Sequence, residues 1–201
     1  MTGPTVNDDA LAEPLRSRWS PTFFDDTETL DRAQVTTLLQ AARWAPSAGN
    51  SQPWVFLVAE RGSGTRAALE EHLSRGNAWV RRPALVLLGC THVGPDPAAP
   101  PSGKPPKDPA YAHHDLGQAA AHVTLQARTM GLDAHQFSGF DKDAVAAALG
   151  LPDHVRLLTG IAVGHRGDPA AAPEAERERE AKPRTRKPLD ELAMVRWGEA
   201  W

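Results

Sequence analysis

The chain has 201 residues and a formal net charge of −3, which predicts a single domain with a sizeable core. This near balance of charge gives no reason to expect nucleic acid or an anionic membrane as a partner. The single cysteine, Cys90, excludes an internal disulfide framework and fits a cytoplasmic protein. The polar start, residues 1–14, lacks the apolar stretch of a signal peptide, and no run approaches the ~20 apolar residues of a membrane span.

The N-terminal region combines a short helix with a polar segment. Residues 7–18 predict a helix that has two leucines on one face and is weakened by Pro14. The next segment, from Arg18 to Phe24, reads Arg-Trp-Ser-Pro-Thr-Phe-Phe. The Arg18 guanidinium is always charged and can hold a phosphate through two parallel hydrogen bonds. Taken alone, an arginine at the end of a helix can equally face solvent.

A polar loop at residues 45–54 separates a helix from a strand. The spacing of apolar residues predicts the helix over 31–44, with Asp31 as its N-cap. Pro46 disfavours continuation of that helix, and Gly49 allows a positive φ and the close approach of a ligand. The polar side chains of the loop both donate and accept hydrogen bonds, which suits a flat, neutral, heteroatom-rich ligand: Ser47, Asn50, Ser51 and Gln52. From composition alone, the stretch is also typical of an ordinary helix–strand connection.

Buried strands and amphipathic helices account for most of the middle of the chain. Strands or extended segments are predicted from apolar runs at 55–59, 84–90, 132–138 and 157–164. Helices are predicted at 64–75, 111–130 and 142–149. The long helix carries a stripe of small residues and ends at Gly131, which is typical of a helix in a core or a dimer interface. Cys90 ends a strand and is interpreted as a core thiol, because no base is adjacent to it.

Two further stretches are dominated by proline or by charge. Residues 94–109 contain seven prolines and predict either a disordered surface loop or a lid over a site. Residues 173–187 predict a solvated connector, although Arg184 and Arg186 could equally present two guanidinium groups on one side of an extended segment. The last segment, 189–201, is expected to pack onto another surface through Leu192, Val195 and Trp197.

A metal site is not expected. His113, His114 and Asp115 are consecutive on the predicted helix and therefore do not share a face. No second cluster at metal-ligand spacing accompanies them. The mixture of segregated helices and a few strands indicates an α+β or α/β class.

Five segments in a fixed order carry the most specific information. They are Arg18–Phe24, Ala45-Pro-Ser-Ala-Gly-Asn-Ser-Gln-Pro-Trp54, the helix from Asp115 to Leu132, Ser138-Gly-Phe-Asp141, and Arg184-Thr-Arg-Lys-Pro-Leu189. From about Leu15 to Trp197, they resemble the nitroreductase family of FMN-dependent oxidoreductases. The resemblance implies an α+β fold, a three-layer sandwich with a central, mostly antiparallel sheet flanked by helices, in an intertwined homodimer. It implies that residues 1–201 form one domain. Residues 94–109 would be a possible lid, and residues 168–201 would be an extension that packs on the partner subunit.

The resemblance also implies two FMN sites at the subunit interface. The phosphate and ribityl side of the cofactor would be bound from one subunit by Arg18, Trp19, Ser20, Thr22, Arg184 and Arg186. The isoalloxazine ring would be lined from the other subunit by Pro46, Ser47, Ala48, Asn50 and Gln52. Flavin N5 would face the backbone N–H groups of Ser138 and Gly139.

The implied reaction is a ping-pong hydride transfer from NADH or NADPH to flavin N5, followed by two-electron reduction of a nitroaromatic, quinone or similar small acceptor. Because the flavin carries the chemistry, no protein nucleophile is expected. Thr22 and Ser138 depart from the family pattern. Thr22 replaces a usual cation, which predicts a lower flavin reduction potential unless Asn77 or Arg81 compensates. The alternatives are a specialised relative, for reductive dehalogenation or flavin breakdown, and a non-catalytic flavin-binding or storage protein.

Overall fold

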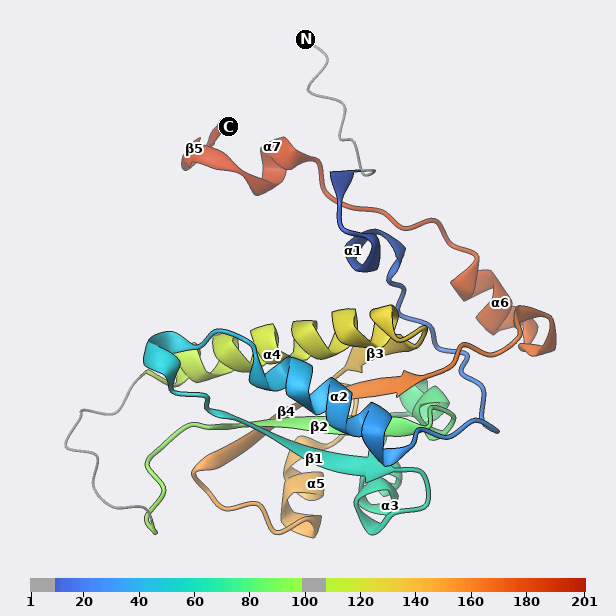
Figure 1. Ribbon diagram of the computed structural model, residues 1–201, viewed down its shortest axis with the longest axis horizontal. Helices are drawn as coiled ribbons and strands as arrows, with labels where there is room; N and C mark the ends of the chain where they lie inside the picture. The colour runs from blue at the N-terminus through green and yellow to red at the C-terminus, as the bar shows by residue number, and fades with distance from the viewer. Residues whose placement is uncertain (1–9, 99–107) are drawn as a thin grey trace.

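A four-stranded antiparallel sheet in the order β1-β2-β4-β3 forms the centre of the computed structural model, which describes residues 10–98 and 108–201 (Figure 1). Helices α2 and α4 cover one face of the sheet, and α3 and α5 cover the other. The chain is therefore an α+β three-layer sandwich, as predicted. The strands are β1 (Trp54–Glu60), β2 (Leu85–His92), β3 (Asp133–Phe137) and β4 (Val155–Gly164). The helices of the two outer layers are α2 (Arg32–Arg43), α3 (Gly64–Glu71), α4 (Pro109–Thr129) and α5 (Lys142–Ala148).

The two central strands are the most deeply buried part of the sheet. Leu88 of β2 pairs with Leu57 of β1 on one side and with Gly160 of β4 on the other. The register between β2 and β4 shifts between Gly89 and Cys90. Cys90 is fully buried, which confirms its interpretation as a core thiol.

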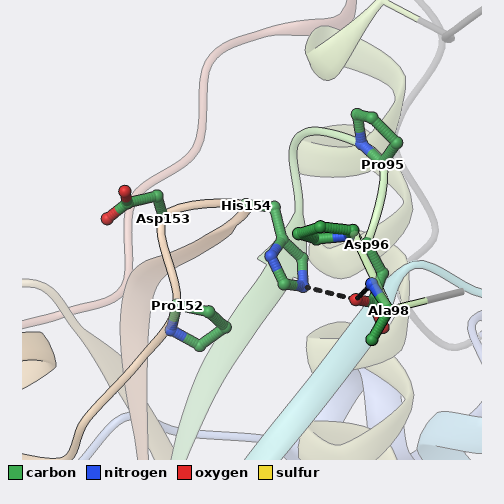
Figure 2. A pocket seen from close by; sticks show the side chains of 7 residues that line it. Pro95, Asp96, Ala98, Pro152, Asp153 and His154 are labelled. Carbon is green, nitrogen blue, oxygen red and sulfur yellow. Dashed lines mark hydrogen bonds and ion pairs between the residues drawn. The ribbon is translucent and has the colours of Figure 1, made fainter.

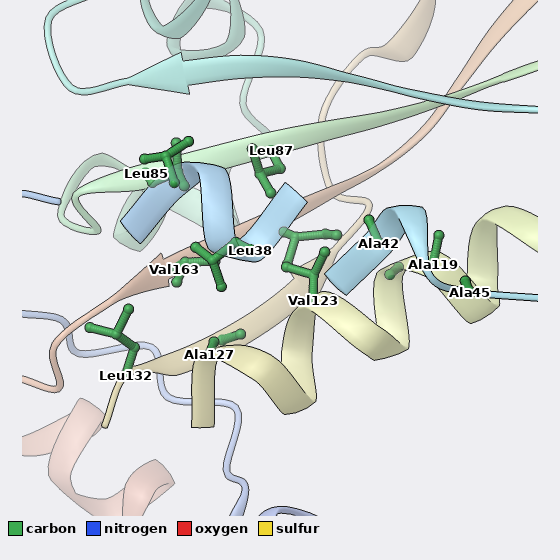
Figure 3. Close-up of a cluster of buried hydrophobic side chains, with 14 residues drawn as sticks. Leu38, Ala42, Ala45, Leu85, Leu87, Ala119, Val123, Ala127, Leu132 and Val163 are labelled. Carbon is green, nitrogen blue, oxygen red and sulfur yellow. The ribbon is translucent and has the colours of Figure 1, made fainter. Parts of the chain in front are cut away.

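The core beneath α2 and α4 explains why the long helix is rich in alanine. Figure 3 shows Ala119, Val123 and Ala127 of α4 against Leu38 and Ala42 of α2 and against the leucines of β2. Small side chains let the two helices and the sheet approach closely while still excluding water. Asp31 caps α2 by accepting the N–H of Gln34, and Gly131 ends α4 with a φ of 74°, as predicted.

Two sequence predictions need correction near the start of the chain. Helix α1 covers only Glu13–Ser17, and Pro14 lies in its first turn, where the missing N–H is not needed, so it does not weaken the helix. Residues 7–9 of the predicted 7–18 helix lie outside the described residues. Strand β1 lies at the edge of the sheet and is only partly buried, with Val55 37% exposed, because one of its sides has no neighbouring strand.

The C-terminal third also differs from its prediction. Within the predicted connector 173–187, helix α6 (Glu174–Glu180) contacts the N-terminal segment through Glu180 and Arg82 through Glu176. The end of the chain forms α7 (Leu189–Leu192) and a small hairpin of β5 (Met194–Arg196) and β6 (Glu199–Ala200). In the single chain its apolar side chains are exposed rather than packed: Leu192, Val195 and Trp197.

Short 3-10 helices complete the structure at Ala48–Asn50, Arg75–Arg81 and Pro169–Ala171. In the described part of the chain, no helix has both the length and the apolar character needed to cross a membrane.

Candidate functional site

Three arginines from opposite ends of the chain lie together beside α1. The Arg184 guanidinium donates to the backbone carbonyl of Arg18 at 3.2 Å, and the Arg18 guanidinium donates to Ser20 Oγ at 3.2 Å. Burial first, and then the charges of Arg186 and Arg184, lower the pKa of Arg18 from its ordinary value. Among the described residues, no carboxylate forms an ion pair with any of these three arginines. The cluster therefore suits an anion that has several acceptor oxygens.

A groove of about 340 Å³ begins at this cluster and follows the edge strand β3. Arg18 and Ser20 line it at one end, and residues 134–136 of β3 line its side. Helix α4 supplies another wall, where Thr124 Oγ1 accepts a hydrogen bond from Gln136 Nε2 at 2.9 Å. The groove therefore lies between Arg18 and β3, and its last lining residue on that strand, Gln136, precedes Ser138 by two positions.

The Ser138–Gly139 segment is held in place through its carbonyl groups. Lys142 Nζ donates to the Ser138 carbonyl, and the Ser74 N–H donates to the Gly139 carbonyl, both at 3.0 Å. A Cβ at Gly139 would lie 1.8 Å from Asn77 Nδ2, so a larger residue here would require the Asn77 side chain to move. Within the described residues, the N–H groups of Ser138 and Gly139 have no acceptor. They are available to a ligand.

Trp19 and Thr22, also predicted to bind the cofactor, are held by Glu180 of α6. Glu180 accepts the Trp19 indole N–H at 2.9 Å, the Thr22 backbone N–H at 2.6 Å and the Thr22 hydroxyl at 3.2 Å. Arg166 pairs with the same carboxylate at 2.9 Å. Burial alone would raise the pKa of Glu180, but these hydrogen bonds and the Arg166 charge hold it below its ordinary value. Thr22 is also 5% exposed, so its side chain is not free to meet a ligand.

The amide-rich loop adopts an uncommon backbone conformation. Gly49 has a φ of 55°, and two residues other than glycine also have positive φ, Asn50 at 53° and Gln52 at 47°. Ser47 stabilises this shape because its carbonyl accepts the Asn50 N–H and its Oγ accepts the Gln52 N–H, both at 3.0 Å. Positive φ at residues with a Cβ is strained, and such strain is concentrated at functional sites. The loop is therefore shaped before any ligand binds.

Asp115 anchors this loop to the first half of α4. Its carboxylate is 2% exposed and accepts the Ala48 N–H at 3.0 Å. Pro46, at the start of the loop, lies just beyond the end of α2. From the sequence, Asp115 was considered as a metal ligand, and no metal site was expected. Its role as the acceptor of a hydrogen bond from the loop was not predicted, although an acidic residue near the start of a buried helix was the signal for a structural acceptor.

The structure does not bring the two halves of the predicted site together within one chain. The loop is bound at Asp115, whereas the segment bearing Arg18 is bound at Arg128, which donates to Ser17 Oγ at 2.8 Å. At 1.5 Å per residue, these two positions on α4 are about 20 Å apart. Figure 1 shows residues 48–50 beside one end of α4 and α1 beside the other.

A second hollow, of about 690 Å³, lies at the described part of the proline-rich stretch (Figure 2). Pro95, Asp96 and Ala98 face Pro152 and His154 across it, and His154 Nε2 lies 3.9 Å from Asp96 Oδ1. None of the predicted cofactor residues lines this hollow. Residues 99–107 of the possible lid lie outside the described chain.

Within the described ranges, no group of three or more His, Cys, Asp or Glu side chains is arranged to hold a metal ion. His114 Nδ1 lies 3.4 Å from the Asp115 carboxylate, which is already used by the loop. Glu180 is the residue that the sequence analysis missed most clearly, because a repeating Glu-Arg run gives no sign of which glutamate is buried.

Comparisons with known proteins identify relatives of this chain and solved structures with the same fold. Residues 15–91 and 71–165 match the model of the nitroreductase family. An uncharacterized 15.4 kDa protein of Mycolicibacterium smegmatis is 36% identical over 152 residues, which cover 71% of this chain and 97% of that protein. A Streptomyces coelicolor protein, named as a candidate NADH dehydrogenase/NAD(P)H nitroreductase, is 27% identical over 81% of this chain and 84% of its own length.

Solved structures share the whole fold. The structure of an oxidoreductase containing FMN is 30% identical, with a TM-score of 0.83 over 97% of this chain and 99% of that chain. A candidate nitroreductase from Exiguobacterium sibiricum, solved in complex with FMN, is 21% identical and shares the fold with a TM-score of 0.74, over 92% and 96% of the two chains. Since the family model covers more than half of the sequence and these relatives cover most of it, the chain belongs to the nitroreductase family of oxidoreductases.

Proposed function

We propose that this protein is an FMN-dependent oxidoreductase that uses NADH or NADPH to reduce a nitroaromatic, quinone or similar small acceptor. The observation that carries the proposal is the cluster of Arg18, Arg184 and Arg186, which has no carboxylate partner in the described chain and lies at the head of a groove. A phosphate monoester is dianionic near neutral pH and needs several charged donors, which this cluster supplies. The FMN named in the similar oxidoreductase structure supports the same cofactor here.

Residues in and around the groove would hold FMN along its length. Arg18, Ser20, Arg184 and Arg186 bind the phosphate and the ribityl chain. The N–H groups of Ser138 and Gly139 face the flavin ring, since neither has an acceptor among the described residues. A second copy of the chain presents its loop to the ring through Pro46, Ser47, Ala48, Asn50 and Gln52. Two copies complete each site, because one chain separates its halves by about 20 Å along α4.

The protein's own groups position the cofactor and the substrates rather than react with them. The bound FMN would supply the redox chemistry, hydride acceptance at N5 and two-electron reduction of the acceptor in a ping-pong cycle, while the residues named above would hold it. Cys90 takes no part, because burial raises the pKa of its thiol to about 12. A single, fully buried thiol also agrees with our expectation of a cytoplasmic protein.

Anaerobic reduction of the purified protein tests this proposal directly. We expect the FMN-loaded protein to lose its flavin absorbance when NADH or NADPH is added, and to recover it when a quinone or nitro compound follows. Failure of both nicotinamides to bleach the flavin would refute the oxidoreductase proposal and favour a storage protein. Recovery only with a halogenated substrate would point to the specialised dehalogenating alternative.

The shared-site arrangement has a separate test. We expect analytical ultracentrifugation to show a dimer at every concentration at which FMN remains bound. A monomer that retains FMN would contradict the contribution of the loop from a second copy. In the dimer, the exposed apolar side chains of the C-terminal hairpin are expected to become covered by the partner.

A further inference from the structure

Two carboxylates of helix α6 attach it to the rest of the chain, and one of them binds the N-terminal segment. Glu180, whose side chain is 12% exposed, accepts hydrogen bonds from Trp19 and Thr22 and pairs with Arg166. One turn earlier, both oxygens of Glu176 pair with Arg82, at 2.6 and 3.1 Å. Neither glutamate belongs to the predicted cofactor residues.

The position of Glu180 in the chain links this attachment to the arginine cluster. Thr22 follows Arg18 by four residues, and Arg184 follows Glu180 by four residues. The carboxylate therefore joins two segments at positions within four residues of the arginine that each segment contributes to the cluster. A further direct contact between the segments is the hydrogen bond from the Arg184 guanidinium to the Arg18 carbonyl.

The cluster needs such an attachment because its members repel one another. The charges of Arg186 and Arg184 disfavour the charged form of Arg18, and no described carboxylate pairs with the three guanidinium groups. Before an anion binds, electrostatic repulsion therefore tends to separate the C-terminal segment from the N-terminal one. A largely buried carboxylate that receives several donors opposes this separation, since hydrogen bonds to charged groups are stronger than neutral ones.

We propose that Glu180 is a positioning residue for the phosphate of the cofactor: its carboxylate clamps the Arg184–Arg186 segment to the Arg18 segment, so that the phosphate meets a preassembled cluster. The inference rests on the proposed function, because it assumes that the cluster receives the FMN phosphate. It adds a residue outside the cofactor contact set and assigns α6 a role in cofactor affinity.

Binding of FMN and of riboflavin, which lacks the phosphate, to the apoprotein tests the role of Glu180. Glu180→Gln retains the shape of the side chain but exchanges one acceptor oxygen for a donor, and Glu180→Ala removes both acceptors. The matched control is Glu178→Gln, since Glu178 is exposed on the same helix. Flavin fluorescence gives both dissociation constants, and circular dichroism gives the melting temperature of each variant.

We expect each Glu180 variant to weaken FMN binding by about tenfold or more, with riboflavin binding changed less than about twofold and the control unchanged. This selective loss would show that the clamp acts on the phosphate subsite. Equal weakening of both flavins, or unchanged FMN binding in a folded Glu180→Gln variant, would overturn the clamp while leaving the cofactor proposal intact. If the wild-type apoprotein binds neither flavin, the proposed function fails, and this inference fails with it.

Discussion

The two ends of α4 hold the two halves of the proposed cofactor site, and they are built in different ways. At the end near α1, the key hydrogen bonds join residues that are 158 to 166 positions apart in the sequence. At the other end, the loop is shaped by hydrogen bonds between residues at most five positions apart, and Asp115 is its anchor on the helix. The first half therefore depends on the completed fold, whereas the second half is largely preset by its own backbone.

This difference explains how the proposed site, if two chains share it, can be specific. A loop that already has its bound shape loses little conformational freedom when a partner's cofactor reaches it. The arginine cluster, in contrast, accumulates like charge, which a bound anion would neutralise, and it is held together by contacts between the two ends of the chain. Variants at either end should consequently fail in different ways, and the following predictions test that contrast.

The largest effect is expected at the arginine cluster. Arg184→Ala and Arg186→Ala should each weaken FMN binding by about 1.5–3 kcal/mol, because each removes a charged hydrogen bond to the phosphate. Riboflavin affinity should change little. The control is Arg43→Ala, an equal loss of charge on α2. Unchanged FMN affinity in both variants, measured by fluorescence titration, would contradict the proposal that this cluster binds the phosphate.

At the opposite end, Asp115→Ala should lower the stability of the protein as well as its cofactor retention. The substitution removes the buried acceptor of the Ala48 N–H, with an expected loss of about 1–3 kcal/mol in the free energy of unfolding. Asp115→Asn keeps an oxygen acceptor and should lose less. Urea unfolding measures the effect, with His113→Ala, on the exposed face of the same helix, as the control. Equal stability of all three variants would show that the loop does not need its anchor.

The contrast between the two ends also explains what the sequence could predict. The helix cap at Asp31, the end of α4 at Gly131 and the polar loop were all predictable, because each depends on residues close together in the chain. The burial of Glu180 was not, because it follows from contacts with Trp19 and Thr22 that only the folded chain creates. For the same reason, the partial exposure of β1 could not be read from its apolar run, since an edge strand and a central strand can have the same composition.

Lowering the pH should weaken the hydrogen bonds that the Glu180 carboxylate accepts. Because the pKa of Glu180 is lowered in the folded state, its contribution is present above the ordinary glutamate value of about 4.3 and is lost as the pH falls through the lowered pKa. NMR titration should show the Thr22 amide and the Trp19 indole N–H signals shifting together, with a midpoint below 4.3. Glu180→Gln should abolish this shared titration. A midpoint above the ordinary value would contradict the hydrogen-bonded carboxylate.

The smallest change in the free energy of unfolding is expected at Gln52. A substitution there should also separate effects on stability from effects on FMN binding. Its φ of 47° is strained for a residue with a Cβ, so Gln52→Gly should raise the free energy of unfolding by about 0.5–1 kcal/mol. Ser51, its neighbour, has a φ of −73°, and Ser51→Gly should instead lower it by about 0.5–1 kcal/mol, because glycine has more freedom to lose on folding. If Gln52 approaches the partner's flavin, the variant that is more stable should also retain FMN less well. Opposite signs for stability and FMN affinity would therefore indicate that the strain serves the cofactor, whereas a loss of stability in Gln52→Gly would mean that the loop needs its glutamine for the fold itself.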